Sequence, residues 1–380
     1  KFIWQSERDG FAHLYQFKDN GQLINQITQG EWALRSSGGP FWLRQSVQAI
    51  NKKSGKIYFT AMKESSVERH LYSVDLSGKN IEKISKEKGV HSIGCSPNGE
   101  YYFDKFSDSS TPPKLSLHSI SGEVVKIIDK PKLDLIIDME LQTPELFTIP
   151  TSDGFPMPAQ ILKPADFDET KEYPLIYHVY GGPSAPTVFD SWQGSSLLYD
   201  NILLRNGYLV VRFDHRSATA ISKTLENRVH LMISGPIEME DIVDGIRWLK
   251  SKDFVDPKRV GIWGWSGGGS FTLNAMTNTP EFKAGISGAP VTDWHYYDTK
   301  WGEFAMKRPQ DNPEGYEKTS FVKSAKNLKG RLLLIHGTYD DNVHPQNSWH
   351  FIDELIKHDI MFDMMFYPMR MHGFKDKPAQ

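Results

Sequence analysis

The stretch from Val260 to Ser270, VGIWGWSGGGS, constrains the fold of this chain more than any other. The stretch begins with an apolar segment typical of a buried strand, and a helix-compatible segment follows its glycines. Between them, Gly264-Trp265-Ser266-Gly267-Gly268 fits the pattern G-x-S-x-G. A serine on a tight strand-to-helix turn leaves no room for neighbouring Cβ atoms, and glycine adopts such backbone angles at little cost. The sequence therefore predicts an elbow that presents the Ser266 hydroxyl beside a helix N-terminus.

This elbow belongs to a long alternation of apolar and amphipathic segments. We expect strands at Leu175–Tyr180, Tyr208–Phe213, Arg259–Trp263, Ala284–Ser287, Arg331–His336 and Phe362–Tyr367. We expect helices at Leu197–Asn206, Met239–Lys252, Phe271–Thr277 and Asn347–His358. Such alternation predicts a parallel sheet covered by helices on both faces. Before these parallel strands, the Asp153-Gly154 turn predicts a hairpin of Glu145–Pro150 and Pro156–Lys163.

Residues 1–135 show a loose internal repeat instead. Three units each open on an aromatic strand-like segment and close on a β run at Ile24–Thr28, Ile81–Ser85 and Val124–Ile128. Short strands repeated at this spacing predict β-propeller blades, and an ordinary meander or sandwich is the alternative. Because closed propellers use about four to eight blades, we expect these to be the last blades of an incomplete propeller whose earlier blades are missing.

We therefore divide the chain into a partial β-propeller, residues 1–135, and an α/β domain, residues 136–380. The sequence stops soon after His372, so we expect this domain to lack a final helix over its last strand. Composition excludes some classes of partner. The net charge is -3 and no basic stripe is present, so we expect neither nucleic acid nor an anionic membrane. No segment approaches the ~20 apolar residues of a membrane span, and a single cysteine, Cys95, excludes an internal disulfide and a cysteine-based zinc site.

A nucleophilic serine needs a base, and the base needs an orienting carboxylate. Asp340 follows one predicted strand, and His372 follows the next. Loops at the carboxyl ends of parallel strands gather at one edge of the sheet, where ligands bind. The chain order serine, acid, histidine is that of α/β-hydrolases. The sequence thus predicts an α/β-hydrolase fold with a triad of Ser266, Asp340 and His372.

Other interpretations of these loops remain. Asp340 could be an ordinary surface acid and His372 a turn residue. We interpret Asp341 as a solvated loop acid, and His336, at a strand end, as a packing or hydrogen-bonding residue. His344 lies in the same loop as Asp340 and is the reserve candidate for the base.

A tetrahedral intermediate needs two donors for its oxyanion. One should be the backbone N–H of Gly267, directly after the proposed nucleophile. The other should come from the loop Tyr180-Gly181-Gly182-Pro183, either from a backbone N–H or from the Tyr180 hydroxyl.

Several segments together carry a family resemblance: Gly261–Ser266, Val179–Pro183, Ala289–Val291, Trp294–Asp298 and His336–His344. They resemble the dipeptidyl peptidase IV branch of the prolyl oligopeptidase family, and Ser6–Tyr15 resembles a late propeller segment of that branch. The resemblance implies an N-terminal β-propeller and a C-terminal α/β-hydrolase domain. It also implies cleavage of peptides near their N-terminus, often after proline.

The resemblance further implies roles for single residues. Ser266 would be the nucleophile, Asp340 the orienting acid and His372 the base, with the Tyr180 hydroxyl as second oxyanion donor. Asn342 would hold the substrate carbonyl one position upstream. The apolar pocket for the proline ring would be lined by Val291, Trp294, Tyr297 and Val343, and by Trp301 where a second tyrosine is usual.

Three departures from the family pattern concern specificity. Gly267 stands where a tyrosine usually follows the nucleophile, Trp301 replaces the pocket tyrosine, and Asp214-His-Arg-Ser-Ala lacks the usual Gly-Arg-Gly. These changes put a preference for proline in doubt. The paired glutamates that grip the substrate amine in this family belong to a segment upstream of Lys1, so we assign none.

We therefore expect a serine peptidase that removes short N-terminal peptides, dipeptides or tripeptides with Xaa-Pro-like preference, through an acyl-enzyme. An esterase or acylaminoacyl peptidase of the same fold is one alternative, and a catalytically silent fragment or binding protein is another. Neither a metal nor an organic cofactor is implied. The resemblance suggests a homodimer, and analogy favours a periplasmic or secreted location over the cytoplasm.

Overall fold

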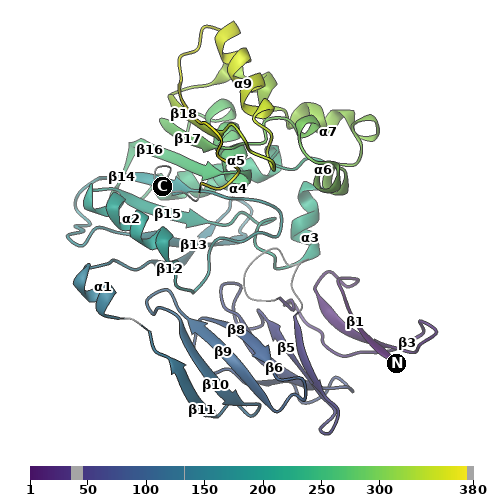
Figure 1. Cartoon of the computed structure of the whole chain (residues 1–380). Helices are drawn as coiled ribbons and strands as arrows, with labels where there is room; N and C mark the ends of the chain where they lie inside the picture. Colours follow the sequence, from purple (N-terminus) through teal and green to yellow (C-terminus); the bar gives the residue numbers. More distant parts are fainter. Residues whose placement is uncertain (36–45, 132, 375–380) are drawn as a thin grey trace. The chain divides into compact units, whose positions relative to one another are not determined.

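The structure is a computed structural model that describes residues 1–35, 46–131 and 133–374. By compactness the chain forms two units, coloured along the sequence in Figure 1. The first comprises residues 1–146, 188–201 and 219–225, and the second comprises residues 147–187, 202–218 and 226–380. The domain boundary that the sequence suggests near residue 135 stays a prediction.

In its described residues, the first unit contains three antiparallel sheets in which consecutive strands are neighbours. They are β1 (Phe2–Ser6), β2 (His13–Phe17) and β3 (Leu23–Gln26); β4 (Val47–Asn51), β5 (Lys56–Ala61), β6 (His70–Asp75) and β7 (Glu82–Lys83); and β8 (Val90–Cys95), β9 (Tyr101–Ser107), β10 (Lys114–Ser119) and β11 (Val124–Asp129). Each sequence repeat forms one sheet. The sequence pattern did not predict β4 and β8, which carry few large apolar residues and are mostly half-buried.

A shared hydrogen-bond pattern explains why the repeat contains the tripeptide His-Leu-Tyr in its first two units. The ring Nδ1 of His13 lies 3.1 Å from the Thr28 hydroxyl, 15 residues later. His70 makes the same contact with Ser85 at 2.9 Å, again 15 residues later. Both histidines are fully buried, and the following leucines and tyrosines pack into the sheet cores. The first two repeats therefore each preserve a buried polar bridge between the strand that carries the histidine, β2 or β6, and the segment at the end of the repeat.

The second unit is built on one eight-stranded sheet with the order β12-β13-β15-β14-β16-β17-β18-β19. Its strands are β12 (Glu145–Pro150), β13 (Pro156–Leu162), β14 (Tyr173–His178), β15 (Leu209–Phe213), β16 (Val255–Trp265), β17 (Ala284–Gly288), β18 (Arg331–Gly337) and β19 (Asp363–Tyr367). All pairs from β15 to β19 are parallel, whereas β13 joins β15 antiparallel. The six predicted strands and the predicted hairpin are confirmed.

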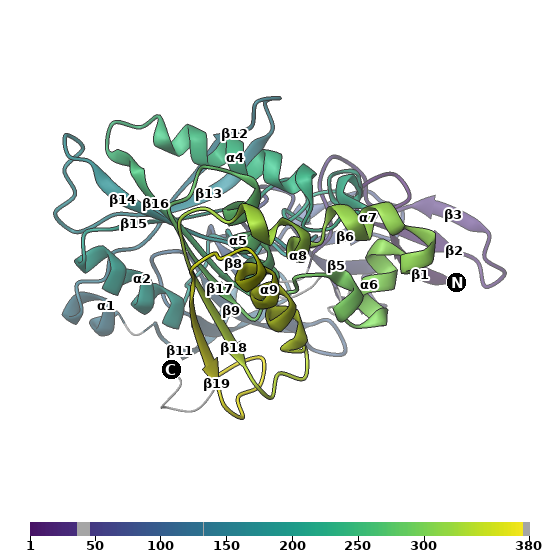
Figure 2. The ribbon, with the colours of Figure 1, turned by 90° about the horizontal axis from the view of Figure 1, so that it is seen from above.

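The helices are α1 (Asp134–Asp138), α2 (Ser195–Arg205), α3 (Lys223–Glu226), α4 (Pro236–Lys250), α5 (Gly267–Asn278), α6 (Thr299–Met306), α7 (Pro313–Lys318), α8 (Phe321–Ser324) and α9 (Gln346–Lys357). The four predicted helices are confirmed, and α5 begins four residues earlier than expected, directly after Ser266. It packs on β16 and β17. The short helices α6 and α7 are grouped together in both views (Figures 1 and 2).

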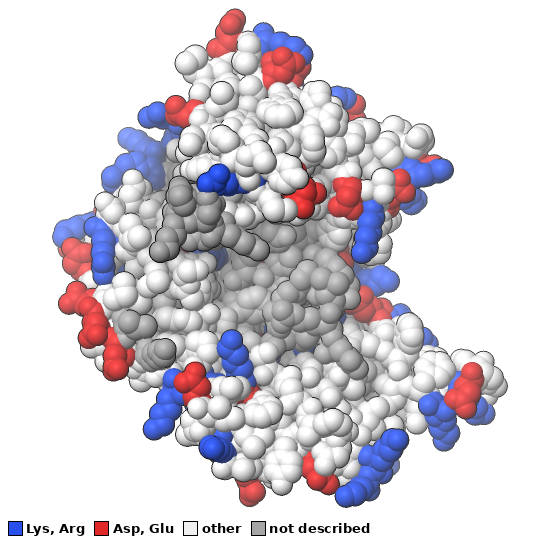
Figure 3. Space-filling model, viewed as in Figure 1, with Lys and Arg blue, Asp and Glu red and all other residues white. Residues whose placement is uncertain are grey.

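The core of the second unit is apolar and continuous, with fully buried Leu175, Val211, Ile242, Phe271 and Phe351 among its members. On the face of the molecule that Figure 3 shows, acidic and basic side chains are interspersed. Over the part of the chain that the structure describes, none of the helices combines the length and the apolar character that a bilayer crossing requires.

Candidate active site

Ser266 occupies the turn between β16 and α5 in an unusual backbone conformation. Its φ is 59° and its ψ is -120°, a region that costs a non-glycine residue about 1–3 kcal/mol. Surrounding structure holds it there, because the Ser266 N–H donates to the Gly288 carbonyl at 2.8 Å and the Ser266 carbonyl accepts from the Ser270 N–H at 3.0 Å. The strained turn between strand and helix is the elbow that the sequence predicts.

Three glycines of the elbow are required by close backbone contacts. A Cβ on Gly264 would lie 2.5 Å from the Val179 carbonyl oxygen, and one on Gly268 would lie 2.1 Å from the same atom. A Cβ on Gly269 would lie 2.4 Å from the Gly288 oxygen. Gly267 differs: its Cβ would meet its nearest neighbour, the Tyr180 carbonyl oxygen, at an ordinary 3.4 Å. The backbone therefore permits a side chain at position 267, and the sequence supplies none.

Asp340 and His372 are hydrogen-bonded to each other. His372 Nδ1 lies 2.8 Å from Asp340 Oδ2, and Asp340 Oδ1 accepts the backbone N–H groups of Asn342 at 3.0 Å and Val343 at 2.9 Å. Burial by itself would raise the pKa of Asp340, but hydrogen bonds from His336 and His372 outweigh it and hold that pKa well below its usual range. The carboxylate is thus ionised near neutral pH and can compensate a positive imidazole.

Asp341, His344 and His336, the other acid and histidines near Asp340, do not share the environment of the Asp340–His372 pair. Asp341 is exposed, and so is His344. The Nδ1 of His344 accepts a long hydrogen bond from the backbone N–H of Gln346, at 3.4 Å. His336 is fully buried and hydrogen-bonded, as the sequence suggests, and its Nε2 also lies 3.2 Å from Asp340 Oδ2.

Trp265 ties the loop of His372 to the elbow. Its indole Nε1 donates to the His372 carbonyl at 2.8 Å, and the two rings lie 6.3 Å apart. Among the described residues, no hydrogen bond joins the Ser266 hydroxyl to the His372 ring. Such bonds are often long in unliganded enzymes and shorten when substrate binds. Sequence reasoning missed the anchoring role of Trp265, and only its position next to Ser266 could have indicated it.

Tyr180 lies two residues beyond the end of β14, beside the start of α5. A Cβ on Gly267 would lie 3.9 Å from the Tyr180 ring carbon that bears the hydroxyl. Gly267 is the first residue of α5, where backbone N–H groups have no partner within the helix. Burial raises the pKa of Tyr180, although 42% of the residue is exposed, so the phenol keeps its proton. Both candidate oxyanion donors therefore lie beside Ser266.

The five residues expected to line an apolar pocket belong to one hydrophobic cluster: Val291, Trp294, Tyr297, Trp301 and Val343. Trp294 and Tyr297 meet edge to face with ring centroids 5.8 Å apart. The Ser270 hydroxyl, four residues after Ser266, bonds both the N–H and the carbonyl of Val291, at 3.0 and 2.8 Å. Sequence reasoning missed Ser270, which links the elbow helix to this cluster.

Asn342 and Tyr297 meet at the exposed edge of the cluster. The Tyr297 hydroxyl donates to Asn342 Oδ1 at 3.0 Å. Burial raises the pKa of Tyr297 to about 12, and the charges of Asp298 and Asp340 contribute. With its oxygen engaged by the phenol, the Asn342 amide presents its N–H₂ end as a donor.

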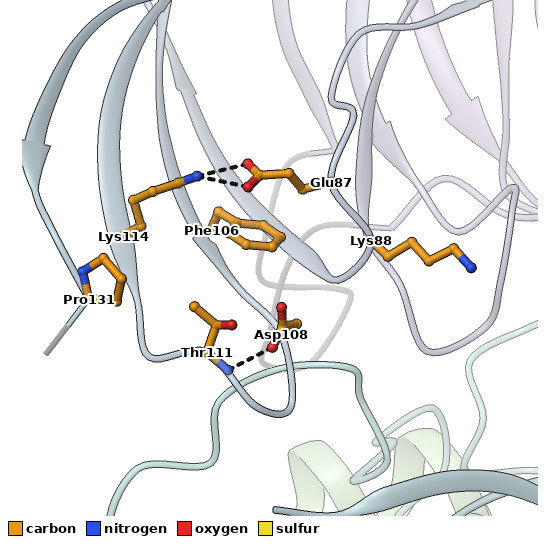
Figure 4. A pocket seen from close by; sticks show the side chains of 7 residues that line it. All are labelled: Glu87, Lys88, Phe106, Asp108, Thr111, Lys114 and Pro131. Carbon is orange, nitrogen blue, oxygen red and sulfur yellow. Dashed lines mark hydrogen bonds and ion pairs between the residues drawn. The ribbon is translucent and has the colours of Figure 1, made fainter. Parts of the chain in front are cut away.

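The described part of the chain also has hollows away from this site. One, of about 370 Å³, is in the first unit (Figure 4) and is lined by Glu87, Lys88, Phe106, Asp108, Thr111, Lys114 and Pro131. There Lys114 pairs with both oxygens of Glu87 at 2.9 Å. Another, of about 500 Å³, adjoins Thr277–Pro280 at the C-terminal end of α5, opposite Ser266. Within the described ranges, no three side chains of His, Cys, Asp or Glu gather as they would around a metal ion.

Comparison with known proteins gives a consistent result. Residues 196–380 match the prolyl oligopeptidase family, and residues 1–113 match the dipeptidyl peptidase IV N-terminal region. A relative from Aspergillus oryzae, named "Probable dipeptidyl-aminopeptidase B", is 32% identical over 96% of this chain and 40% of its own length. A relative of the same name from Emericella nidulans is 33% identical over the same shares. The chain thus spans about 40% of the length of these curated relatives.

A solved structure extends the likeness to three dimensions. The dipeptidyl peptidase 4 of Porphyromonas gingivalis superposes with a TM-score of 0.92 at 30% identity, over 100% of this chain and 52% of that one. The α/β-hydrolase fold preceded by propeller blades is therefore confirmed. Through both of its domains, this chain belongs to the prolyl oligopeptidase family, in its dipeptidyl peptidase IV branch.

Proposed function

We propose that the protein is a serine peptidase that removes short peptides from the N-terminus of its substrates, with Ser266, His372 and Asp340 as its triad. The observation that carries this proposal is the 2.8 Å hydrogen bond between His372 and Asp340, in a loop anchored to the residue before Ser266. The family membership and the relatives named dipeptidyl peptidases support the same activity.

In the first half of the reaction, His372 Nε2 takes the proton of the Ser266 hydroxyl while Oγ attacks the scissile carbonyl. The Gly267 N–H and the Tyr180 O–H donate to the oxyanion that forms, because both lie beside the elbow. The imidazolium is stabilised by the ionised Asp340. It then protonates the leaving amine, and the acyl-enzyme remains on Ser266.

In the second half, water attacks the acyl-enzyme. His372 takes a proton from this water and returns it to the Ser266 oxygen when the tetrahedral intermediate collapses. Every proton in this cycle is moved by one imidazole. The raised pKa of Tyr180 keeps the second oxyanion donor protonated throughout the neutral range.

Specificity for the acyl side follows from the apolar cluster. A ring or small apolar side chain would pack among Val291, Trp294, Tyr297, Trp301 and Val343. Asn342, oriented by Tyr297, would donate to the preceding substrate carbonyl. Trp301 and Gly267 stand where the family pattern usually has tyrosines, so two walls of this pocket would differ from the usual ones. Residues other than proline are therefore also candidates for the position before the cleaved bond.

The assignment of residues 1–135 to a partial propeller and 136–380 to the catalytic domain forms part of this proposal. A homodimer also remains a prediction, and size-exclusion chromatography with light scattering tests it.

A panel of chromogenic substrates tests the reaction class. We expect hydrolysis of the 4-nitroanilides of Gly-Pro and Ala-Ala, and no gain in kcat/KM when the same dipeptides are N-acetylated. Faster cleavage of the acetylated forms would instead identify an acylaminoacyl peptidase. Cleavage of 4-nitrophenyl esters alone would identify an esterase, and no turnover of any substrate would favour a silent binding protein.

A further inference from the structure

His336 is a buried histidine that shares the acid of the proposed triad. Its ring is fully buried in β18, and its Nε2 lies 2.8 Å from the Val343 carbonyl oxygen and 3.2 Å from Asp340 Oδ2. That same Oδ2 accepts the bond from His372 Nδ1 at 2.8 Å. One carboxylate oxygen is therefore contacted by two imidazoles, of which the proposed mechanism uses one.

The neighbours of His336 fix its tautomer. A backbone carbonyl and an ionised carboxylate can only accept hydrogen bonds, so Nε2 carries the proton. On the other side of the ring, the buried Ser348 hydroxyl of α9 lies 2.7 Å from Nδ1 and can donate to it. The ring is also parallel to Phe366 of β19, with centroids 6.3 Å apart. The N–H at Nε2 is thus directed at the Val343 carbonyl and at Asp340 Oδ2.

We propose that His336 is a positioning residue for the reaction: its Nε2–H holds Asp340 Oδ2 toward His372 and limits the negative charge that His372 meets. This inference rests on the proposed function. A donor to the carboxylate spreads its charge, so the attraction between Asp340 and a protonated His372 is weaker with the donor than without it.

Within the ranges that the structure describes, three titratable side chains interact with Asp340: His336, His372 and, through space, Tyr297. Ser348 and Phe366, from the packed elements α9 and β19, carry no charge. A change in the pH profile after substitution of His336 can therefore be assigned to the Asp340–His372 pair.

Four variants separate a positioning role of His336 from a role in packing alone. His336→Phe keeps a planar ring against Phe366 and removes the donor. His336→Gln places an amide N–H near the position of Nε2, whereas His336→Asn places one near the position of Nδ1. Ser348→Ala is the matched structural control, because it removes a buried hydrogen bond from the same ring and leaves Nε2–H on Asp340.

The measurement is the pH dependence of kcat/KM, with the active fraction titrated by a fluorophosphonate. We expect His336→Phe and His336→Asn to move the acidic limb upward by about 0.5 pH units and to lower kcat about tenfold, with KM within about twofold. His336→Gln should restore both values, and Ser348→Ala should leave the limb in place. If His336→Phe fails to fold, the comparison of His336→Gln with His336→Asn gives the same test.

The proposal is wrong if the acidic limb of the pH profile stays fixed in His336→Phe and His336→Asn, and if their loss of activity equals their loss of the active fraction that the fluorophosphonate titrates. It is also wrong if Ser348→Ala moves the limb as far as they do. Failure of the proposed function would look different, because the parent protein itself would then show neither fluorophosphonate labelling nor turnover.

Discussion

The indole of Trp265 donates a hydrogen bond to the main-chain carbonyl of His372 at 2.8 Å, across 107 residues of sequence. The residue before the proposed nucleophile thus holds the loop that carries the proposed base. This contact sets the backbone position of His372, whereas Asp340 sets the orientation of its ring.

Removal of that indole donor should leave His372 in place as the base but position its loop less well for catalysis. We expect Trp265→Phe to lower kcat about tenfold with little change in KM, because a lost hydrogen bond of about 1 kcal/mol leaves the loop less well placed. Steady-state kinetics on a dipeptidyl 4-nitroanilide measure the effect. Trp349→Phe, on the exposed side of α9, is the control and should retain the parent values. Equal kcat values in both variants would contradict the anchoring role.

Asp340 should make the stability of the protein depend on pH. Its pKa in the folded state lies below the unfolded value of about 4, so its contribution is complete above pH 4 and is lost as the pH falls further. We expect Asp340→Asn to be less stable than the parent by about 1–3 kcal/mol at pH 7. Urea unfolding at several pH values should show this gap narrowing below about pH 4. A gap that stays constant down to pH 3 would contradict the assignment.

Tyr180 and Tyr297 offer a pair of phenols whose loss should affect different kinetic constants. Tyr180→Phe removes the proposed oxyanion donor and should lower kcat by about 10²–10³-fold with little effect on KM. Tyr297→Phe removes the bond that orients Asn342 and should mainly raise KM, by about fivefold. Identical effects of the two substitutions on kcat would show that Tyr180 has no special role at the oxyanion.

The two glycines that follow Ser266 should tolerate alanine very differently. Gly268→Ala places a methyl group 2.1 Å from the Val179 carbonyl and should destabilise the fold by about 1–3 kcal/mol or more. Gly267→Ala meets ordinary contacts and should change stability by less than about 1 kcal/mol, in the stabilising direction, since it lies in a helix. Thermal unfolding measures both. Gly261→Ala in β16 is a control away from the elbow, because its Cβ would lie 3.6 Å from its nearest neighbour, the Ala284 carbonyl oxygen of β17.

Much of the second unit could be predicted from the sequence because its strands are apolar runs bounded by turn residues. Ser266, Asp340 and His372 follow three such strands, so their approach to one sheet edge follows from topology alone. The start of α5 could not be predicted as well. The glycines after Ser266 read as a turn, but they are helical because α5 packs against backbone atoms of Val179 and Gly288.

The missed features depend on contacts between distant segments. Apart from its position next to Ser266, nothing in the sequence around Trp265 indicates that its indole meets the His372 carbonyl. Ser270 likewise gives no local sign that it holds Val291. His336 reads as a packing residue at a strand end. Its approach to Asp340 depends on the sharp turn of the intervening loop, where Asp340 Oδ1 accepts two backbone N–H groups.

Labelling with a fluorophosphonate, followed by intact-mass analysis, tests the central claim most directly. The account predicts that the parent protein gains one adduct on Ser266, and that Ser266→Ala and His372→Ala gain none within the same time while remaining folded. Labelling of folded Ser266→Ala at the parent rate, or a folded parent that takes up no probe, would contradict the assignment of Ser266 as an activated nucleophile.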